Sequence, residues 1–342
     1  MKFNNEVFYY TKDNKKFYSK IEALLYSQKT KQQLFLYYYD DTYNKINWSI
    51  EPPQTLDFYY KEQALRIREE YDYVVLFYSG GADSTNILET FYYNNIKIDK
   101  IVMVGAFSQD PHKYSDKNHN AELYLNSFPY IQKLGLSSIC QLCDYSKMFD
   151  DVKQFKIYQF GEEWSEEIIG RYSPHNWFWY DIENYVVPDK MKDKKVALIW
   201  GKDKPNIINL INNESYFSFV DVTVLNYGTG TSIKENEHID RINFYWDPNF
   251  TDILVKQLYT LMQLQKINLP IEDKIYNLKT PIIHKSKKSS SLYLSLRDTF
   301  LVNNVNSEIF DFYKIGLKNI ESKIGLSNLN RLIYSQKYNL RK

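Results

Sequence analysis

The segment Tyr73–Thr85, with the sequence YVVLFYSGGADST, constrains the fold of this chain more than any other stretch. Its first part, Tyr73–Tyr78, is a continuous run of apolar and aromatic residues, which is typical of a buried strand. Ser79 and two glycines end that run, and an apolar stripe at helical spacing follows over Ser84–Tyr93. We therefore predict a strand, a tight loop and a helix, the unit from which α/β folds are built.

The loop between this strand and helix has the composition of an anion site. Gly80 and Gly81 allow positive φ angles and a close approach of the backbone to a ligand. Ser79, Ser84 and Thr85 supply hydroxyl groups, and a helix start supplies N–H groups and the positive end of the helix dipole. We predict that the loop binds phosphate. It matches neither a Walker A loop nor a dinucleotide fingerprint, and a glycine turn that binds nothing is the alternative.

Composition limits the class of protein. The 342 residues are enough for one large domain or two ordinary ones, and 44% hydrophobic with 25% charged residues is typical of a soluble globular protein. A net charge of +1 gives no overall attraction to membrane or nucleic acid, so we expect no membrane partner, and a nucleic-acid partner is disfavoured but stays open. Two cysteines, no signal-peptide core and no apolar run long enough to cross a bilayer predict a cytoplasmic protein.

Strand and helix patterns alternate along the middle of the chain. We predict strands at Tyr73–Tyr78, Ile98–Val104, Ser138–Leu142 and Lys195–Trp200, and helices at Ser84–Tyr93 and Asn120–Leu134. This rhythm predicts an α/β fold with a doubly wound, mainly parallel sheet. The carboxyl ends of parallel strands lie at one edge, so the loop after Tyr78, Gly105 and Gly201 are expected to lie close together.

The chain is predicted to divide into three segments. Residues 1–70 form a small N-terminal subdomain, residues 71–250 form the core, and residues 251–342 form a C-terminal α/β extension that is mainly helical. Outside the core sheet, helices are predicted at Ser19–Ser27, Leu56–Tyr71 and Phe250–Gln265, and a strand at Leu34–Asp40. Two later segments, Ser215–Asn226 and Ile242–Trp246, are interpreted as antiparallel strands.

A second glycine loop follows the strand Lys195–Trp200, where the sequence reads LIWGKDKP. Mg²⁺ is usually held by one or two carboxylates together with phosphate oxygens, and Asp83 and Asp203 form a candidate pair. Lys202 and Lys204 are candidates for neutralising the charge of a departing pyrophosphate. A charged, solvent-exposed turn is the alternative interpretation.

The pattern S-G-G-x-D-S between a strand and a helix resembles the pyrophosphate loop of the PP-loop ATP pyrophosphatases. Within that superfamily the chain is most similar to the synthetase domain of asparagine synthetase, in a compact stand-alone form suggested also by FYWDPNF at Phe244–Phe250. Members cleave ATP between the α and β phosphates, adenylate a substrate and release pyrophosphate. The resemblance covers about Tyr71–Trp246 and implies a HUP- or Rossmann-like ATP-binding core with ATP and Mg²⁺ as cofactors.

The resemblance also implies roles for individual residues. The pyrophosphate would be held by Ser79, Gly80, Gly81, Ser84 and Thr85, and the rest of the nucleotide and its phosphates would lie against Met103, Gly105 and Gly201. Asp83 and Asp203 would hold Mg²⁺, and Asp83, Lys202 and Lys204 would be the catalytic residues. The second loop departs from the family pattern G-x-G-x-D-E.

The expected reaction is an AMP-forming ligation. A carboxylate or amide oxygen of a small-molecule acceptor would attack ATP, and an amine such as ammonia would then displace AMP. Asn120, Glu122 and Asn126 are candidates for lining the acceptor pocket, although Glu122 is also explained by the helix dipole. Arg171 and His175 are candidates for binding a carboxylate.

The N-terminal segment is the main departure from asparagine synthetase, and it bears on the source of the amine. That enzyme carries an N-terminal glutaminase domain with a cysteine after the initiator Met, and this chain has Lys2 there. The segment before the loop is also too short for such a domain. We therefore expect the amine to come from solvent or from a partner glutaminase.

Two other functions stay open. Cys140 and Cys143 form a C-x-x-C pair, which together with a PP-loop resembles tRNA thiolases and suggests sulfur transfer or a metal. Two cysteines on a strand are otherwise small hydrophobic residues, and a near-neutral chain argues against a nucleic-acid substrate. The third possibility is a non-catalytic interaction protein that binds ATP without releasing pyrophosphate.

Overall fold

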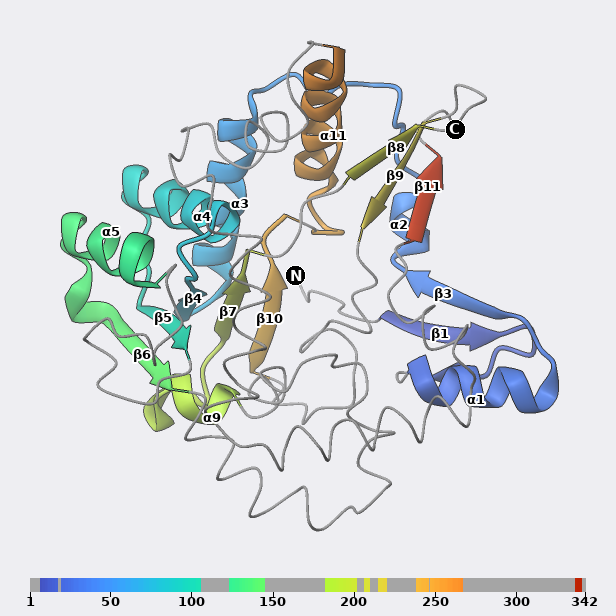
Figure 1. Cartoon of the computed structure of the whole chain (residues 1–342), viewed down its shortest axis with the longest axis horizontal. Helices are drawn as coiled ribbons and strands as arrows, with labels where there is room; N and C mark the ends of the chain where they lie inside the picture. The colour runs from blue at the N-terminus through green and yellow to red at the C-terminus, as the bar shows by residue number, and fades with distance from the viewer. Residues whose placement is uncertain are drawn as a thin grey trace.

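The computed structural model describes residues 7–17, 20–105, 123–144, 182–201, 206–209, 215–219, 238–245, 247–266 and 336–339 of the chain. Its largest element is a five-stranded parallel sheet with flanking helices (Figure 1). A small antiparallel sheet is formed by N-terminal residues, and another by segments from later in the sequence. The predicted α/β fold with a parallel central sheet is confirmed.

The strand order of the central sheet reverses near its middle. The sheet contains β4 (Tyr73–Phe77), β5 (Lys100–Gly105), β6 (Cys140–Asp144), β7 (Val196–Trp200) and β10 (Ile239–Asn243). Their order is β10-β7-β4-β5-β6, and all neighbouring pairs are parallel. The chain runs outward from β4 to β6 and then returns to place β7 on the other side of β4. Open α/β sheets bind ligands at such a switch, outside the carboxyl ends of the strands.

The strands β4 and β7 end at the same level. Their register pairs Phe77 with Trp200, and these two rings stack with centroids 4.3 Å apart and planes 10° apart. Both strands are apolar along their length, because helices cover both faces of the sheet. Tyr78 and Gly201 therefore leave the sheet from adjacent positions.

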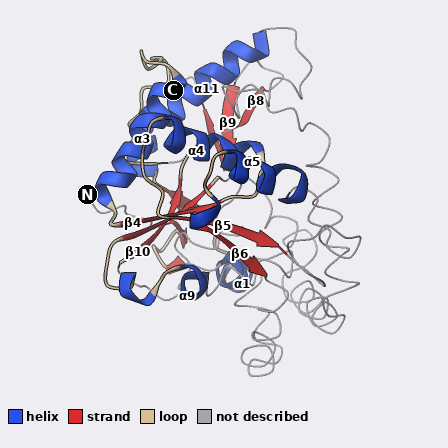
Figure 2. Ribbon diagram, turned by 90° about the vertical axis from the view of Figure 1, so that its left-hand side faces the viewer, coloured by secondary structure: helices blue, strands red, loops and turns tan. Residues whose placement is uncertain are grey.

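One face of the sheet carries most of the helices. These are α3 (Leu56–Glu70), α4 (Ala82–Tyr93), α5 (Phe128–Lys133) and α11 (Thr251–Lys266), as Figure 2 shows. All four contribute to one hydrophobic cluster, through residues that include Ile67, Leu88, Ile131 and Leu254. Because α3 precedes residue 71 and α11 follows residue 250, parts of all three predicted segments share this core.

The other face packs on the short helix α9 (Ile182–Val186), seen on the opposite side of the sheet in Figure 2. Lys100 Nζ of β5 donates a hydrogen bond to the Val186 carbonyl oxygen at 2.8 Å. Arg241 of β10 donates to Glu183 Oε1 from Nε at 2.9 Å and from Nη2 at 2.6 Å. These contacts join α9 to strands on both sides of β4.

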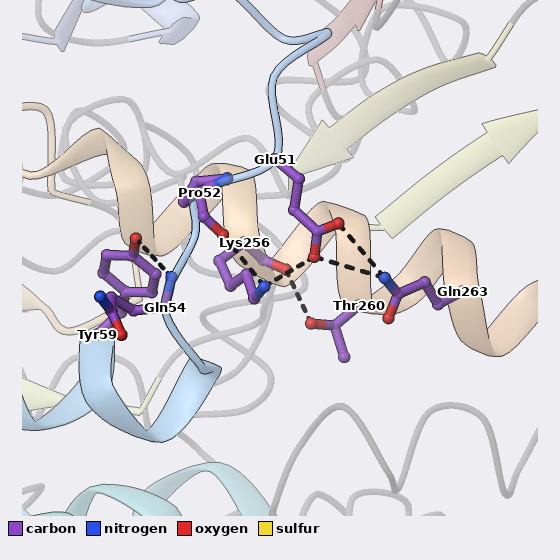
Figure 3. Close-up of polar contacts among 7 residues, drawn as sticks. All are labelled: Glu51, Pro52, Gln54, Tyr59, Lys256, Thr260 and Gln263. Carbon is purple, nitrogen blue, oxygen red and sulfur yellow. Dashed lines mark hydrogen bonds and ion pairs between the residues drawn. The ribbon is translucent and has the colours of Figure 1, made fainter.

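The contacts in Figure 3 connect α11 to the segment that leads into α3. Lys256 Nζ lies 2.7 Å from Glu51 Oε1 and donates to the Pro52 carbonyl oxygen at 3.2 Å. One turn further along α11, Thr260 Oγ1 donates to the Lys256 carbonyl oxygen at 2.9 Å. About two turns from Lys256, Gln263 Nε2 donates to Glu51 Oε1 at 3.4 Å. Segments far apart in sequence are thus joined beside the core.

The N-terminal sheet is antiparallel and has the order β2-β1-β3. Its elements are β1 (Val7–Thr11), β2 (Lys16–Phe17), α1 (Lys20–Thr30) and β3 (Leu34–Tyr38), and α2 (Asp40–Tyr43) follows. Tyr9, Phe17 and Ala23 form a small core between sheet and α1. On the other face, the rings of Phe8 and Tyr37 stack across β1 and β3 with centroids 4.8 Å apart.

The remaining sheet has the order β11-β9-β8 and is antiparallel. Its strands are β8 (Asn206–Asn209), β9 (Ser215–Phe219) and β11 (Gln336–Asn339). β9 lies in the predicted strand Ser215–Asn226, and β11 belongs to the predicted C-terminal extension. None of the helices in the described ranges is long and apolar enough to span a lipid bilayer.

The structure corrects the predicted helix Asn120–Leu134. A π-helical turn, Leu123–Ser127, precedes α5, and a 3₁₀ turn, Ser137–Ile139, follows it before β6 begins. Pro129 lies in the first turn of α5 and has no N–H to donate, so one uninterrupted α-helix cannot form across it. A second 3₁₀ turn, Asp189–Met191, lies between α9 and β7.

The predicted antiparallel strand Ile242–Trp246 is also corrected. The strand β10 begins three residues earlier, at Ile239, and is parallel to β7. Phe244 and Tyr245 are fully buried, which makes them resemble strand residues in the sequence. They are buried because the chain turns beneath α3 and α4, where both rings contact Tyr60.

Asp99, just before β5, connects α3, β4 and β5. Its carboxylate lies 2.5 Å from Arg68 Nη1 and 2.6 Å from Lys97 Nζ, and it accepts a hydrogen bond from the Val74 N–H at 2.9 Å. Burial alone would raise the pKa of Asp99, but the hydrogen bonds from Lys97, Arg68 and Val74 outweigh burial and lower it.

We predict that Asp99→Asn destabilises the protein by about 2 kcal/mol at pH 7, because charged hydrogen bonds are lost in a buried position. The folded-state pKa is depressed, so this stabilisation is present above the unfolded pKa of about 3.9 and is lost as the pH falls through the folded pKa. Urea unfolding of the wild type and of Asp99→Asn between pH 7 and pH 3 measures the difference in their free energies of unfolding. The control Asp189→Asn removes an exposed ion pair with Lys192 and should have little effect. A difference between wild type and Asp99→Asn that does not change with pH would contradict the prediction.

Candidate functional site

The S-G-G-x-D-S loop leaves the central strand at the switch in strand order. It follows β4 directly, and α4 begins at Ala82. Gly201 follows β7 on one side, and Gly105 ends β5 on the other. The three predicted positions therefore lie at the carboxyl edge of three adjacent strands, as the alternation of strands and helices led us to expect.

The loop is shaped by its own hydroxyl groups. The Ser79 N–H donates to Ser84 Oγ at 3.2 Å, and the Gly81 N–H donates to Ser79 Oγ at 3.2 Å. Ser84 Oγ in turn donates to the Gly81 carbonyl oxygen at 3.2 Å. Gly80 has a φ angle of +81°, in the left-handed region that only glycine adopts readily. The side chains of Ser79 and Ser84 thus order the loop in the absence of a ligand.

The start of α4 has the geometry of an anion site. Its N-cap is Gly81, which has no side chain to accept from the first turn, and the first intrahelical bond runs from the Thr85 N–H to the Gly81 carbonyl oxygen at 3.0 Å. The start of α3 differs, because Thr55 Oγ1 there accepts from the Phe58 N–H at 3.2 Å. N–H groups that precede the first intrahelical bond, together with the helix dipole, attract anions.

Two predicted ligand residues have buried side chains. Thr85 is fully buried, and its Oγ1 lies 3.4 Å from the Tyr78 hydroxyl. Met103 of β5 is 3% exposed and packs in the main hydrophobic cluster. Of these two residues, only backbone groups are therefore available to a ligand at this edge of the sheet.

Asp83 lies in the first turn of α4, where the helix dipole favours a negative charge. Its carbonyl oxygen accepts a hydrogen bond of 2.7 Å from the Tyr245 hydroxyl. Burial raises the pKa of Tyr60 and of Tyr245, and the charge of Asp83 raises both further. The negative charge of Asp83 thus favours the protonated form of both buried hydroxyl groups.

Two close backbone approaches hold the loop from outside. A Cβ atom at Gly201 would lie 2.8 Å from the Ser84 nitrogen and 2.9 Å from the Asp83 carbonyl carbon. A Cβ atom at Gly80 would lie 2.2 Å from Ser127 Oγ and 3.1 Å from the Ser127 nitrogen. At both Gly201 and Gly80, close packing against a neighbouring segment leaves no room for a side chain.

Ser127 and Tyr245 were not predicted as site residues. Ser127 belongs to the π-helical turn, a feature found often at functional sites, and it is fully buried. Its neighbour Asn126, a predicted pocket residue, also lies against Gly80. The only signal in the sequence was the FYWDPNF segment around Tyr245, which gave no role for that residue.

Several predicted residues lie outside the described part of the chain. Lys202, Asp203 and Lys204 follow Gly201 directly in sequence, and the structure does not describe them. The same holds for the other candidate acceptor-binding residues, Asn120, Glu122, Arg171 and His175. Their roles stay predictions.

Cys140 and Cys143 both lie on β6. Residues three apart on a strand point to opposite faces, so the two thiols do not form a joint site. Burial raises the pKa of Cys140 to about 12 and that of Cys143 to about 11, which keeps both protonated at neutral pH. Among the residues that the structure describes, no group of three His, Cys, Asp or Glu side chains is placed to hold a metal ion.

In comparisons with protein-family models and with curated proteins, nothing matched this chain. The loop combines the N–H groups of a helix start, which has no side-chain cap, with the carboxylate of Asp83 in the first turn of that helix.

We predict that Gly201→Ala destabilises the protein by about 3 kcal/mol, because the new Cβ would meet backbone atoms of α4 that no side-chain rotation can move away. The matched control is Gly135→Ala. Gly135 has a φ angle of +71° but nothing within 4 Å of an added Cβ, so only backbone strain of about 1 kcal/mol is expected. Urea unfolding of the variants measures both effects. Equal destabilisation by the two substitutions would show that β7 and α4 are not in this contact.

Proposed function

We propose that this chain is an AMP-forming, ATP-dependent enzyme of the PP-loop pyrophosphatase type, similar to the synthetase domain of asparagine synthetase. The observation that carries the proposal is the position of the S-G-G-x-D-S loop. It lies at the carboxyl end of the central strand, where the strand order reverses, and it opens a helix whose N-cap is glycine.

The loop suits a pyrophosphate group for three physical reasons. Gly80 and Gly81 keep the loop free of bulky side chains. The N–H groups at the start of α4 point toward the loop and carry the positive end of the dipole. The loop is already ordered by the hydrogen bonds of Ser79 and Ser84, so little conformational entropy is lost when an anion binds.

Mg²⁺ would supply positive charge to the phosphates of the nucleotide, and Asp83 is the proposed ligand that the structure describes. Asp83 would contribute one carboxylate, and Asp203 is the proposed second ligand. Gly201 touches the first turn of α4, and Asp203 follows Gly201 closely in sequence, which supports Asp83 and Asp203 as a pair. Lys202 and Lys204 would stabilise the charge on the leaving pyrophosphate.

The reaction we propose is an adenylation followed by aminolysis. A carboxylate or amide oxygen of a small-molecule acceptor would bond to the α-phosphorus, and the bond from that phosphorus to the bridging oxygen would break to release pyrophosphate. An amine, from solvent or from a partner glutaminase, would then attack the activated carbon of the acceptor, lose a proton and displace AMP. The protein would contribute positioning and charge stabilisation, as in other phosphoryl and nucleotidyl transfers.

The test is turnover of Mg-ATP labelled at the α-phosphate, in the presence of a pool of carboxylate and amide metabolites. We expect AMP and pyrophosphate, and we expect Asp83→Asn to lower their formation by about a hundredfold. The matched control is Asp57→Asn. Asp57 is the second residue of α3 as Asp83 is of α4, so both variants lose a carboxylate from the first turn of a helix.

Each other outcome contradicts the proposal in its own way. ADP as the product, or equal activity of the two variants, would show that the loop does not perform this chemistry. ATP binding without pyrophosphate release would favour the non-catalytic interaction protein. Copurifying RNA together with loss of activity on replacing Cys140 and Cys143 would favour the thiolase-like enzyme.

A further inference from the structure

We infer that Tyr245 is a positioning residue for the Ser79–Ser84 loop, and this inference rests on the proposed function of that loop. Tyr245 lies in the FYWDPNF segment after β10, which the proposed chemistry does not use. Its hydroxyl donates to the Asp83 carbonyl oxygen at 2.7 Å and accepts from Asn86 Nδ2 at 3.1 Å. One buried hydroxyl thus contacts α4 at two points, in its first turn and at the start of its second.

The peptide unit between Asp83 and Ser84 is held from two sides. Tyr245 bonds its carbonyl oxygen, and Gly201 packs against its carbon and nitrogen, where an added Cβ would lie at 2.9 and 2.8 Å. A peptide unit is planar, so the direction of the C=O group fixes the direction of the N–H group at its other end. That N–H belongs to Ser84 and precedes the first intrahelical bond of α4, which begins at Thr85. Tyr245 and Gly201 together therefore orient a donor of the proposed phosphate site.

Tyr245 is itself held firmly. Its side chain is fully buried, and its ring packs edge-on against Tyr60 of α3 and Phe244, with centroids 5.7 and 5.3 Å away. Its carbonyl oxygen accepts from Gln257 Nε2 of α11 at 3.1 Å, and Gln257 also donates to the Ile253 carbonyl oxygen at 3.1 Å. The hydroxyl is thus fixed by contacts from both α3 and α11, and donors fixed in advance lose less entropy when they bind a ligand.

The test compares Tyr245→Phe with Tyr71→Phe in the full chain. Tyr71 is 3% exposed, and its hydroxyl donates to Asp240 Oδ2 at 2.9 Å, near the amino ends of the same strands. Both variants keep the ring. Tyr245→Phe loses two buried hydrogen bonds to α4, whereas Tyr71→Phe loses a hydrogen bond to Asp240 of β10. Two quantities are measured: the affinity for pyrophosphate with Mg²⁺ by calorimetry, and the hydrogen exchange of peptides covering α4 without ligand.

We expect Tyr245→Phe to weaken pyrophosphate binding about tenfold, as the loss of the hydrogen bond that orients the Asp83–Ser84 peptide implies, and to speed exchange at the start of α4. Tyr71→Phe should change neither. Equal exchange at α4 in the two variants, or unchanged affinity in Tyr245→Phe, would overturn the positioning role. If the wild-type chain binds no pyrophosphate, the proposed function is wrong, and the exchange comparison alone then decides whether Tyr245 orders the start of α4.

Discussion

The contact between Gly201 and the first turn of α4 is the constraint on which the rest of the site depends. It brings the end of β7 to within van der Waals distance of the Asp83–Ser84 peptide, at the place where the strand order reverses. Only glycine allows this approach. Because β4 and β7 are in register through Phe77 and Trp200, the sheet sets the position of this contact and hence the position of the loop.

Stability and function make different demands on the start of α4. A side-chain cap like that of Thr55 on α3 would satisfy an N–H group, but it would also occupy the space that an anion needs. Glycine at the N-cap is less stable than a capping residue by roughly a few tenths of a kcal/mol. The buried hydroxyl of Tyr245 and the packing of Ser127 on Gly80 hold the loop without entering that space.

Local patterns in the sequence predicted the sheet, the helix α4 and the glycine loop, because each depends on residues close together in the chain. They could not predict Tyr245 or Ser127, whose contacts with the loop join segments far apart in sequence. The burial of Thr85, in contrast, was available from helical spacing, because it lies three residues before the core residue Leu88 and shares its face. The bounds of two elements differ from those predicted. Pro129 interrupts the predicted helix before α5, and the buried Phe244 and Tyr245, which resemble strand residues, lie in the turn after β10.

The most direct test of the account is a crystal structure of the chain with Mg²⁺ and an ATP analogue whose α–β bridge is a methylene group, which resists cleavage. We predict that its β and γ phosphates lie on the N–H groups at the start of α4, between Gly80 and Ser84, with the metal beside Asp83. The analogue bound elsewhere, with its phosphates away from this loop, would contradict the assignment of the loop as a phosphate site.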